Sequence, residues 1–302
     1  MPHRRTDGQS RDHDDPRDNL TVDVQNALIQ ERASQVCSED SSVAMLWNVF
    51  RSLQKLEAAL WLPRVLTHAL GWKKDSRQAA ALSATLRAGV EFHWWRRYDV
   101  PPSRQAWLHT QALNANLDLT HYPARYLPEK KQEIARNLET GLPLEERVEV
   151  PLCIETRDWV LGVFAVYKDN LRQHTRYDAR RDDLVRMLDA GTWDAQASGK
   201  RFLSLVVYAD ARTYNTETKR LIDLYHANGG FLVARLPYRT DVDVLQQAAL
   251  HLGELRWRTL GALLLDAKDE ERIGLFDVAV LDELIKYLAR KDIGFNLFRR
   301  LK

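Results

Sequence analysis

The stretch FLSLVVYAD at positions 202–210 decides the fold of the last third of this chain. It is almost wholly apolar and ends at Asp210, which predicts a strand buried on both faces. Further strands are predicted at Phe231–Leu236, Leu260–Leu265 and Ile293–Phe298, with helical segments between them. Short strands that alternate with helices of about ten or more residues indicate a mainly parallel sheet covered by helices. Residues 196–302 are therefore predicted to form an α/β domain.

Residues 20–195 carry a different pattern, which predicts an α+β region. Helical spacing of apolar residues covers 43–70 and 76–87, and another predicted helix runs from Pro128 to Glu139. The runs Arg147–Ile154 and Trp159–Tyr167 flank a short polar turn, which predicts an antiparallel hairpin. The second run is apolar on both alternating faces, so we expect a central strand covered on both sides. The segment Gly191–Arg201 is the predicted linker, with a domain boundary near residue 195.

Composition excludes some classes of protein. The formal net charge of +2 creates no global field that would favour a nucleic acid or a membrane. The two cysteines, Cys37 and Cys153, form neither a disulfide framework nor a zinc spacing, and they suit a reducing, cytoplasmic location. No apolar run approaches the ~20 residues that span a bilayer. Residues 1–19 are polar, lack the apolar core of a signal peptide, and are expected to be a disordered tail.

The segment 140–190 resembles the C-terminal half of a GAF domain, a small-molecule sensor fold related to PAS. The matching segments are Thr140–Pro143, Val150–Leu152, Gly162–Val166 and Asp178–Leu188. The resemblance implies a sensor pocket, whose wall would include Trp94, Trp95, Trp159 and Phe164. The same alternation is also that of an α+β core without a ligand, and this alternative stays open.

The acidic residues after the predicted strands are candidates for chemistry. Ligands bind at the carboxyl ends of parallel strands, where Asp210, Asp266 and Asp269 are expected, and Mg²⁺ prefers carboxylate ligands. This arrangement resembles response-regulator receivers, which carry acidic residues after the first strand and a phosphoacceptor aspartate after the third. Asp210 and Asp266 are the candidate metal ligands, and all three aspartates are candidate catalytic residues if their carboxylates converge. Alternatively, Asp210 caps the next turn and residues 266–271 form a solvated loop.

The region 196–302 is also similar to Rossmann-like domains in its alternation of strands and helices. No glycine-rich loop follows its first strand, which argues against binding of a dinucleotide or nucleoside triphosphate in the standard mode.

The segment HWWRRY at positions 93–98 interleaves cations with aromatic rings. Such a pattern suits stacking on bases and contact with phosphates, which makes Arg96, Arg97 and Arg104 candidate nucleic-acid contacts. It equally suits tryptophans in a core whose arginines reach the surface. Arg180 and Arg181 are expected on a solvated face.

The sequence shows no complete catalytic constellation of a known hydrolase, such as G-x-S-x-G or H-E-x-x-H. We therefore expect a cytosolic regulatory protein that binds a ligand or partner rather than an enzyme. Its nine tryptophans suit an interface with a protein partner or a second copy. Two alternatives stay open: a Mg²⁺-dependent phosphoryl-transfer or phosphodiester enzyme using the three aspartates, and a nucleic-acid-binding component using residues 93–98.

Overall fold

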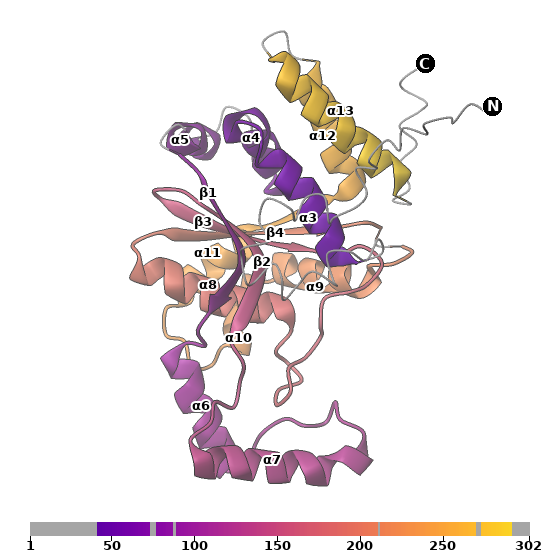
Figure 1. Cartoon of the computed structure of the whole chain (residues 1–302). Helices are drawn as coiled ribbons and strands as arrows, with labels where there is room; N and C mark the ends of the chain where they lie inside the picture. Colours follow the sequence, from indigo (N-terminus) through magenta and orange to yellow (C-terminus); the bar gives the residue numbers. More distant parts are fainter. Residues whose placement is uncertain (1–40, 73–76, 87–88, 211, 270–272, 292–302) are drawn as a thin grey trace, which may run out of the picture.

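The computed structural model describes residues 41–72, 77–86, 89–210, 212–269 and 273–291. The predicted tail at 1–19 and the predicted strand Ile293–Phe298 lie outside these residues. The described chain forms one mixed sheet of five strands in the order β1-β2-β3-β4-β5 (Figure 1). The strands are β1 (Glu91–Tyr98), β2 (Val148–Glu155), β3 (Trp159–Ala165), β4 (Arg201–Tyr208) and β5 (Leu252–Arg256). β1, β2 and β3 pair antiparallel, whereas β3, β4 and β5 pair parallel.

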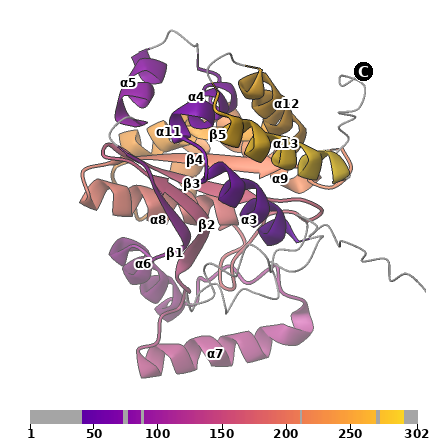
Figure 2. The ribbon, with the colours of Figure 1, turned by 45° about the horizontal axis from the view of Figure 1, so that its top comes forward.

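Helices cover both faces of the sheet (Figures 1 and 2). One face carries α3 (Ser42–Leu53), α4 (Ala58–Ala69), α5 (Arg77–Leu86), α12 (Trp257–Lys268) and α13 (Leu275–Arg290). The other carries α8 (Asp183–Ala197), α9 (Thr216–Ala227), α10 (Gly229–Arg235) and α11 (Val242–Leu250). Each face therefore has its own apolar core. None of the helices in the described part of the chain is both long enough and apolar enough to cross a membrane.

The helices α6 (Pro102–Leu113) and α7 (Leu127–Thr140), with the short 3-10 helix η1 (Ala124–Tyr126), project from the sheet as a separate lobe (Figure 1). This α6–α7 lobe has a small core of its own, formed by Leu108, Leu119, Ile134, Leu144 and Tyr177. α7 ends where Gly141 adopts the left-handed conformation (φ 68°), as a glycine after a helix commonly does.

The predicted hairpin is confirmed as β2 and β3, and the predicted first strand of the C-terminal region is confirmed as β4. Every residue of β3 is buried, as expected for a strand covered on both sides. The predicted linker is wrong, because α8 continues to Ala197. The predicted boundary near residue 195 thus lies within α8, and β3 and β4 pair directly across it. A division into two domains is not confirmed.

Two of the strands predicted for the C-terminal sheet are wrong, because both segments are largely helical. Phe231–Leu236 lies in and just after α10, whose N-terminus is capped by Asn228 through the N–H of Gly230. Leu260–Leu265 belongs to α12. A short apolar run fits either a strand or a helix. Over a longer window the spacing of buried residues distinguishes the two, and in α12 these residues recur at helical intervals: Trp257, Leu260, Gly261, Leu264 and Ala267. The strand that pairs with β4 is instead β5, a short segment with little apolar alternation.

The segment 93–98 lies in the edge strand β1 and contains a backbone irregularity. Trp95 has a φ of 50°, in the left-handed region, and it lies between the pairs Trp94–Leu152 and Arg96–Val150. Its position faces Pro151, which has no N–H to donate to a neighbouring strand. The side chains of β2 change faces at this point. Val150 belongs to the core on the α8 side, whereas Leu152, two residues later, belongs to the core under α3 and α4.

Candidate functional site

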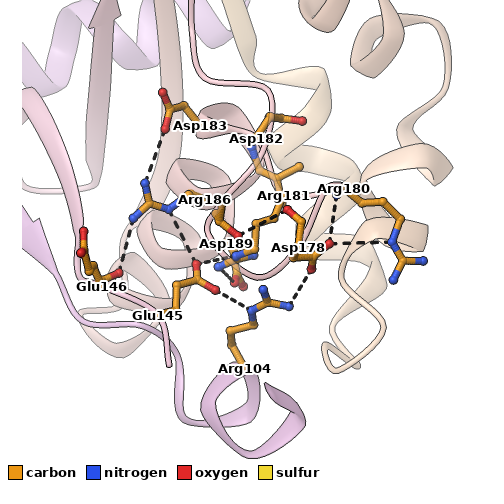
Figure 3. A network of polar contacts seen from close by, with 12 residues as sticks. Arg104, Glu145, Glu146, Asp178, Arg180, Arg181, Asp182, Asp183, Arg186 and Asp189 are labelled. Carbon is orange, nitrogen blue, oxygen red and sulfur yellow. Dashed lines mark hydrogen bonds and ion pairs between the residues drawn. The ribbon is translucent and has the colours of Figure 1, made fainter. Parts of the chain in front are cut away.

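A network of charged side chains is buried where the α6–α7 lobe meets α8 (Figure 3). Its centre is Glu145, which follows α7 in the chain. The Nε atoms of Arg104 and Arg181 donate to its two carboxylate oxygens over 2.8 and 2.6 Å. Arg104 and Arg181 are each only 1% exposed. The prediction that Arg181 lies on a solvated face is therefore wrong.

Two aspartates complete the network on either side of Glu145. Asp178 forms an ion pair with Nη1 of Arg104 at 3.2 Å. Asp189, which is fully buried in α8, accepts from Arg181 over 2.8 Å and from the Tyr238 hydroxyl over 2.6 Å. The helix α8 is thus tied to the lobe through a chain of charge-assisted hydrogen bonds, the stronger class of hydrogen bond in proteins.

The arginines determine the ionisation of Glu145. Burial alone would raise the pKa of this carboxyl, but Arg181 and Arg104 outweigh burial and hold the pKa at about 2. Glu145 is therefore a buried carboxylate anion at neutral pH. Removing it would leave the guanidinium groups around it without their main counter-charge.

Arg186 of α8 is the least well neutralised member of this group. The residue is 7% exposed, and its Nε has no hydrogen-bond partner among the described residues. Its terminal nitrogens make only long contacts: 3.5 Å to Asp183 Oδ1, 3.4 Å to the carbonyl of Glu146 and 3.3 Å to that of Arg147. Nε lies 3.7 Å from Glu145, which Arg104 and Arg181 already occupy. Burial lowers the pKa of Arg186 more than Glu145 and Asp183 raise it.

A cavity of about 310 Å³ lies beside the Arg186 side chain. The Arg186 cavity is bounded by residues from α7, from the segment 143–146, from the loop 172–177 and from α8. Two further arginines line it, Arg172 and Arg176, together with the rings of Tyr122, His174 and Tyr177. It opens into a wider groove that is also lined by Arg97, Arg136, Arg147 and Phe164.

The other arginines of the cavity are exposed and paired. Arg172 contacts Asp183 at 3.2 Å, and Arg176 contacts Glu133 at 2.8 Å. Half or more of each side chain is solvent-accessible, so each ion pair is weak and can exchange its partner at little cost. The cavity thus combines one buried guanidinium with two exposed ones. Planar guanidinium groups bind carboxylates and phosphates through paired N–H donors.

The aspartates predicted as catalytic or metal-binding residues are not brought to one edge of the sheet. Asp210 follows β4, and its Oδ1 accepts the backbone N–H of Arg212 over 2.9 Å, which is the capping role left open above. Asp266 lies inside α12 and Asp269 at its C-cap, so the expected strand end is absent there. In the described part of the chain, no three His, Cys, Asp or Glu side chains are placed to bind a metal ion together.

The four residues predicted to line a ligand pocket lie in three places. Trp94 and Trp95 pack on the ring of Trp47, with centroids 4.7 and 5.3 Å apart, and Trp94 Nε1 donates to Gln54. Phe164 lines the groove beside the Arg186 cavity. Trp159 lines a separate cavity, at the end of the sheet where β3 and β4 begin.

The three arginines predicted to contact nucleic acid also differ from one another. Arg104 is buried in the network described above. Arg96 is half-buried between Glu155 (2.5 Å) and Asp194 (2.9 Å). Arg97 is more exposed and contacts Glu149 at 3.3 Å. The contact with nucleic acid remains a prediction, and of the three side chains that of Arg97 is the most exposed, at 41%.

Sequence inspection missed Glu145, Arg186 and Asp189. The only local signal was the charge run RRDDLVR at 180–186, which is ambiguous between a solvated face and a buried network. Comparison with known proteins adds no further candidates, because no family model, curated protein or solved structure matches this chain.

Proposed function

We propose that this protein is a regulatory ligand-binding protein, and that its ligand is a small anion held by Arg186 in the cavity between the α6–α7 lobe and α8. The observation that carries the proposal is the incomplete neutralisation of Arg186, a buried guanidinium with an unused Nε donor beside an open cavity. Burying a charge costs several kcal/mol unless its partners compensate well. An anionic ligand would supply the missing acceptor.

The charges around Glu145 favour the same conclusion. One carboxylate lies within 4 Å of three guanidinium groups, at 2.8 Å from Arg104, 2.6 Å from Arg181 and 3.7 Å from Arg186. The first two also reach Asp178 and Asp189. Among the described residues, the only further carboxylate near Arg186 is that of Asp183, at 3.5 Å, and Asp183 is shared with Arg172. A ligand carboxylate or phosphate would therefore form its most favourable ion pair with Arg186.

The size of the cavity limits the ligand. A volume of about 310 Å³ lies at the small end of the usual range for small-molecule sites. A carboxylate or phosphate on a compact metabolite fits this volume, with the rings of Tyr122 and Tyr177 as partly apolar walls. Because the lining includes Arg186 of α8 and Asn137 of α7, a bound ligand would also stabilise the position of the lobe. Such a coupling would make the protein regulatory.

Thermal unfolding with phosphate, sulfate and small mono- and dicarboxylates tests this function. A ligand at a hundredfold excess over its Kd adds about 2.7 kcal/mol of stability, which raises the unfolding midpoint measurably. We expect at least one of these anions to raise the midpoint of the unmodified protein. Arg186→Gln should abolish that shift, measured from the variant's own baseline.

Arg147→Gln is the matched control. Arg147 lines the outer groove but not the Arg186 cavity, and it forms an exposed ion pair with Asp99, so its loss should leave the shift intact. The function proposed here is wrong if no anion shifts the midpoint, or if Arg186→Gln and Arg147→Gln respond to the anions alike.

A further inference from the structure

A second cavity, of about 270 Å³, lies at the end of the sheet where β3 and β4 begin. Its lining includes Trp72, Thr85, Trp159, Arg201, Leu203 and His251. None of these residues lines the Arg186 cavity or its outer groove. Its surface is more apolar than polar, with a few polar groups converging on it, which is the usual character of a small-molecule site.

Trp159 supplies a buried polar group without a partner. The residue is 7% exposed, yet its indole Nε1 has no hydrogen-bond acceptor among the described residues. Buried tryptophan N–H groups usually find an acceptor, because an unmade hydrogen bond in an apolar environment is costly. The indole ring itself is held by the core under α3 and α4. The residue lines this cavity, so its unpartnered N–H is the donor that we assign to a ligand there.

Arg201 supplies a cation to the same cavity lining. It is the first residue of β4 and pairs with Trp159, the first residue of β3, so the two side chains lie on the same face of the sheet. Its backbone N–H donates to the carbonyl of Asp158 over 3.0 Å, whereas its guanidinium makes no ion pair or hydrogen bond with any described residue. The carboxylate of Asp158, which also lines this cavity, accepts from the Thr85 hydroxyl over 3.2 Å and lies 4.0 Å from Nε of Arg157.

His251 and Trp72 close the cavity with aromatic rings. The two rings meet edge to face, with centroids 6.3 Å apart and planes at 86°. Burial and the nearby Arg201 both lower the pKa of His251, so its imidazole is neutral at pH 7 and adds no further charge. A flat, apolar ring in this cavity can therefore pack against these side chains without displacing a charged group.

We propose that this second cavity binds a small aromatic carboxylate. The aromatic ring of the ligand packs against Trp72, Trp159 and Leu203, its carboxylate pairs with Arg201, and one of its acceptor atoms takes the indole N–H of Trp159. The site is independent of the anion site at Arg186, since the two share no lining residue.

Isothermal titration of the full chain with benzoate and indole-3-acetate tests this site. Indole, which lacks the carboxylate, and cyclohexanecarboxylate, which lacks the aromatic ring, are the matched probes. We expect saturable binding of at least one aromatic acid and binding weaker by about tenfold or more for both matched probes.

Two variants separate the contributions of the side chains. Arg201→Gln removes the cation from an exposed position, and Trp159→Phe keeps an aromatic ring while removing the N–H. Each should weaken binding of the aromatic acid by about tenfold. Arg186→Gln should leave it unchanged, so that this site and the proposed function can fail separately. The inference is overturned if neither aromatic acid binds at millimolar concentration, or if Arg201→Gln, folded as judged by its unfolding midpoint, binds as tightly as the unmodified protein.

Discussion

Gly191 in α8 lies so close to Phe202 in β4 that a Cβ atom at position 191 would stand 2.3 Å from Cζ of the phenylalanine ring. The same ring atom would be 2.9 Å from a Cβ atom at Gly162 in β3. Two glycines thus make room for one ring between the helix and the sheet. A glycine inside a helix costs about 1 kcal/mol relative to alanine, so this close packing explains why Gly191 is tolerated in the middle of α8.

Gly191→Ala should therefore destabilise the protein although alanine is the better helix former. Overpacking of a core typically costs about 1–3 kcal/mol, and chemical denaturation measures it. Gly229→Ala is the control, because a Cβ atom there meets Ala249 at an ordinary 3.9 Å, and its effect should be close to zero. Phe202→Leu should recover part of the loss in the Gly191→Ala background. Equal or greater stability of Gly191→Ala would show that α8 can shift away from β4.

Glu145→Gln should be among the most destabilising single changes at a charged position. It leaves Arg104, Arg181 and Arg186 without their shared carboxylate, and breaking a buried ion pair typically costs about 3–5 kcal/mol. Asp99→Asn removes the partner of Arg147 in an exposed pair and should cost about 0–1 kcal/mol. Urea denaturation of both variants makes the comparison. A cost below about 1 kcal/mol for Glu145→Gln would mean that water or a rearranged network neutralises the arginines.

The ionisation of Glu145 also predicts an acid transition. Its pKa is about 2 in the folded protein against an ordinary 4.5, so the unfolded state binds the proton more readily. The stabilisation is complete above pH 4.5 and is lost as the pH falls towards 2. The free energy of unfolding, followed from pH 6 to pH 3, should fall more steeply for the unmodified protein than for Glu145→Gln. Parallel curves would contradict the low pKa.

A second loss of stability should appear at higher pH, from His121. Burial and the neighbouring His174 lower the pKa of His121 below its ordinary 6.5, more than Asp118 and Asp178 raise it. As the pH falls, His121 takes up a proton in the unfolded state before it does so in the folded state. Its contribution to the free energy of unfolding is therefore fully present above pH 6.5 and is lost as the pH falls through the folded-state pKa. Burial lowers the pKa of His251 as well, so its loss of stability falls in the same direction. His121→Gln should flatten the pH profile of the unfolding midpoint between pH 7 and pH 5; an unchanged slope would assign the decline to other groups.

Arg96 and Arg97 should differ in their contribution to stability although they are neighbours in the sequence. Arg96 is held by Glu155 and Asp194 and lies over the Tyr98 ring, 5.0 Å from its centroid. Arg97 forms an exposed contact with Glu149. We expect Arg96→Ala to cost about 1–3 kcal/mol and Arg97→Ala less than about 1 kcal/mol, measured by thermal unfolding. Similar costs for the two variants would indicate that the network around Glu155 contributes little.

Part of the fold could be predicted from local sequence, for a physical reason. β3 and β4 are continuous apolar runs, and only a strand covered on both faces uses such a run fully. Likewise, α7 has Pro128 in its first turn and ends at Gly141, residues that favour the start and the end of a helix. The segments 231–236 and 260–265 were too short for periodicity to separate a strand from a helix. Whether each segment formed a strand or a helix depended on which neighbouring element could bury its apolar side chains.

The sequence by itself determined the mixed α and β character, the β2–β3 hairpin and the buried strand β4, because these depend on the spacing of apolar residues within a few turns or strands. Only the tertiary structure decided the candidate site. Glu145, Arg104 and Arg186 come from three separate segments of the chain, and each alone looks like an ordinary surface charge. Whether a charged side chain is buried, paired or left incompletely neutralised depends on the partners that distant segments bring to it, and no local pattern in the sequence contains that information.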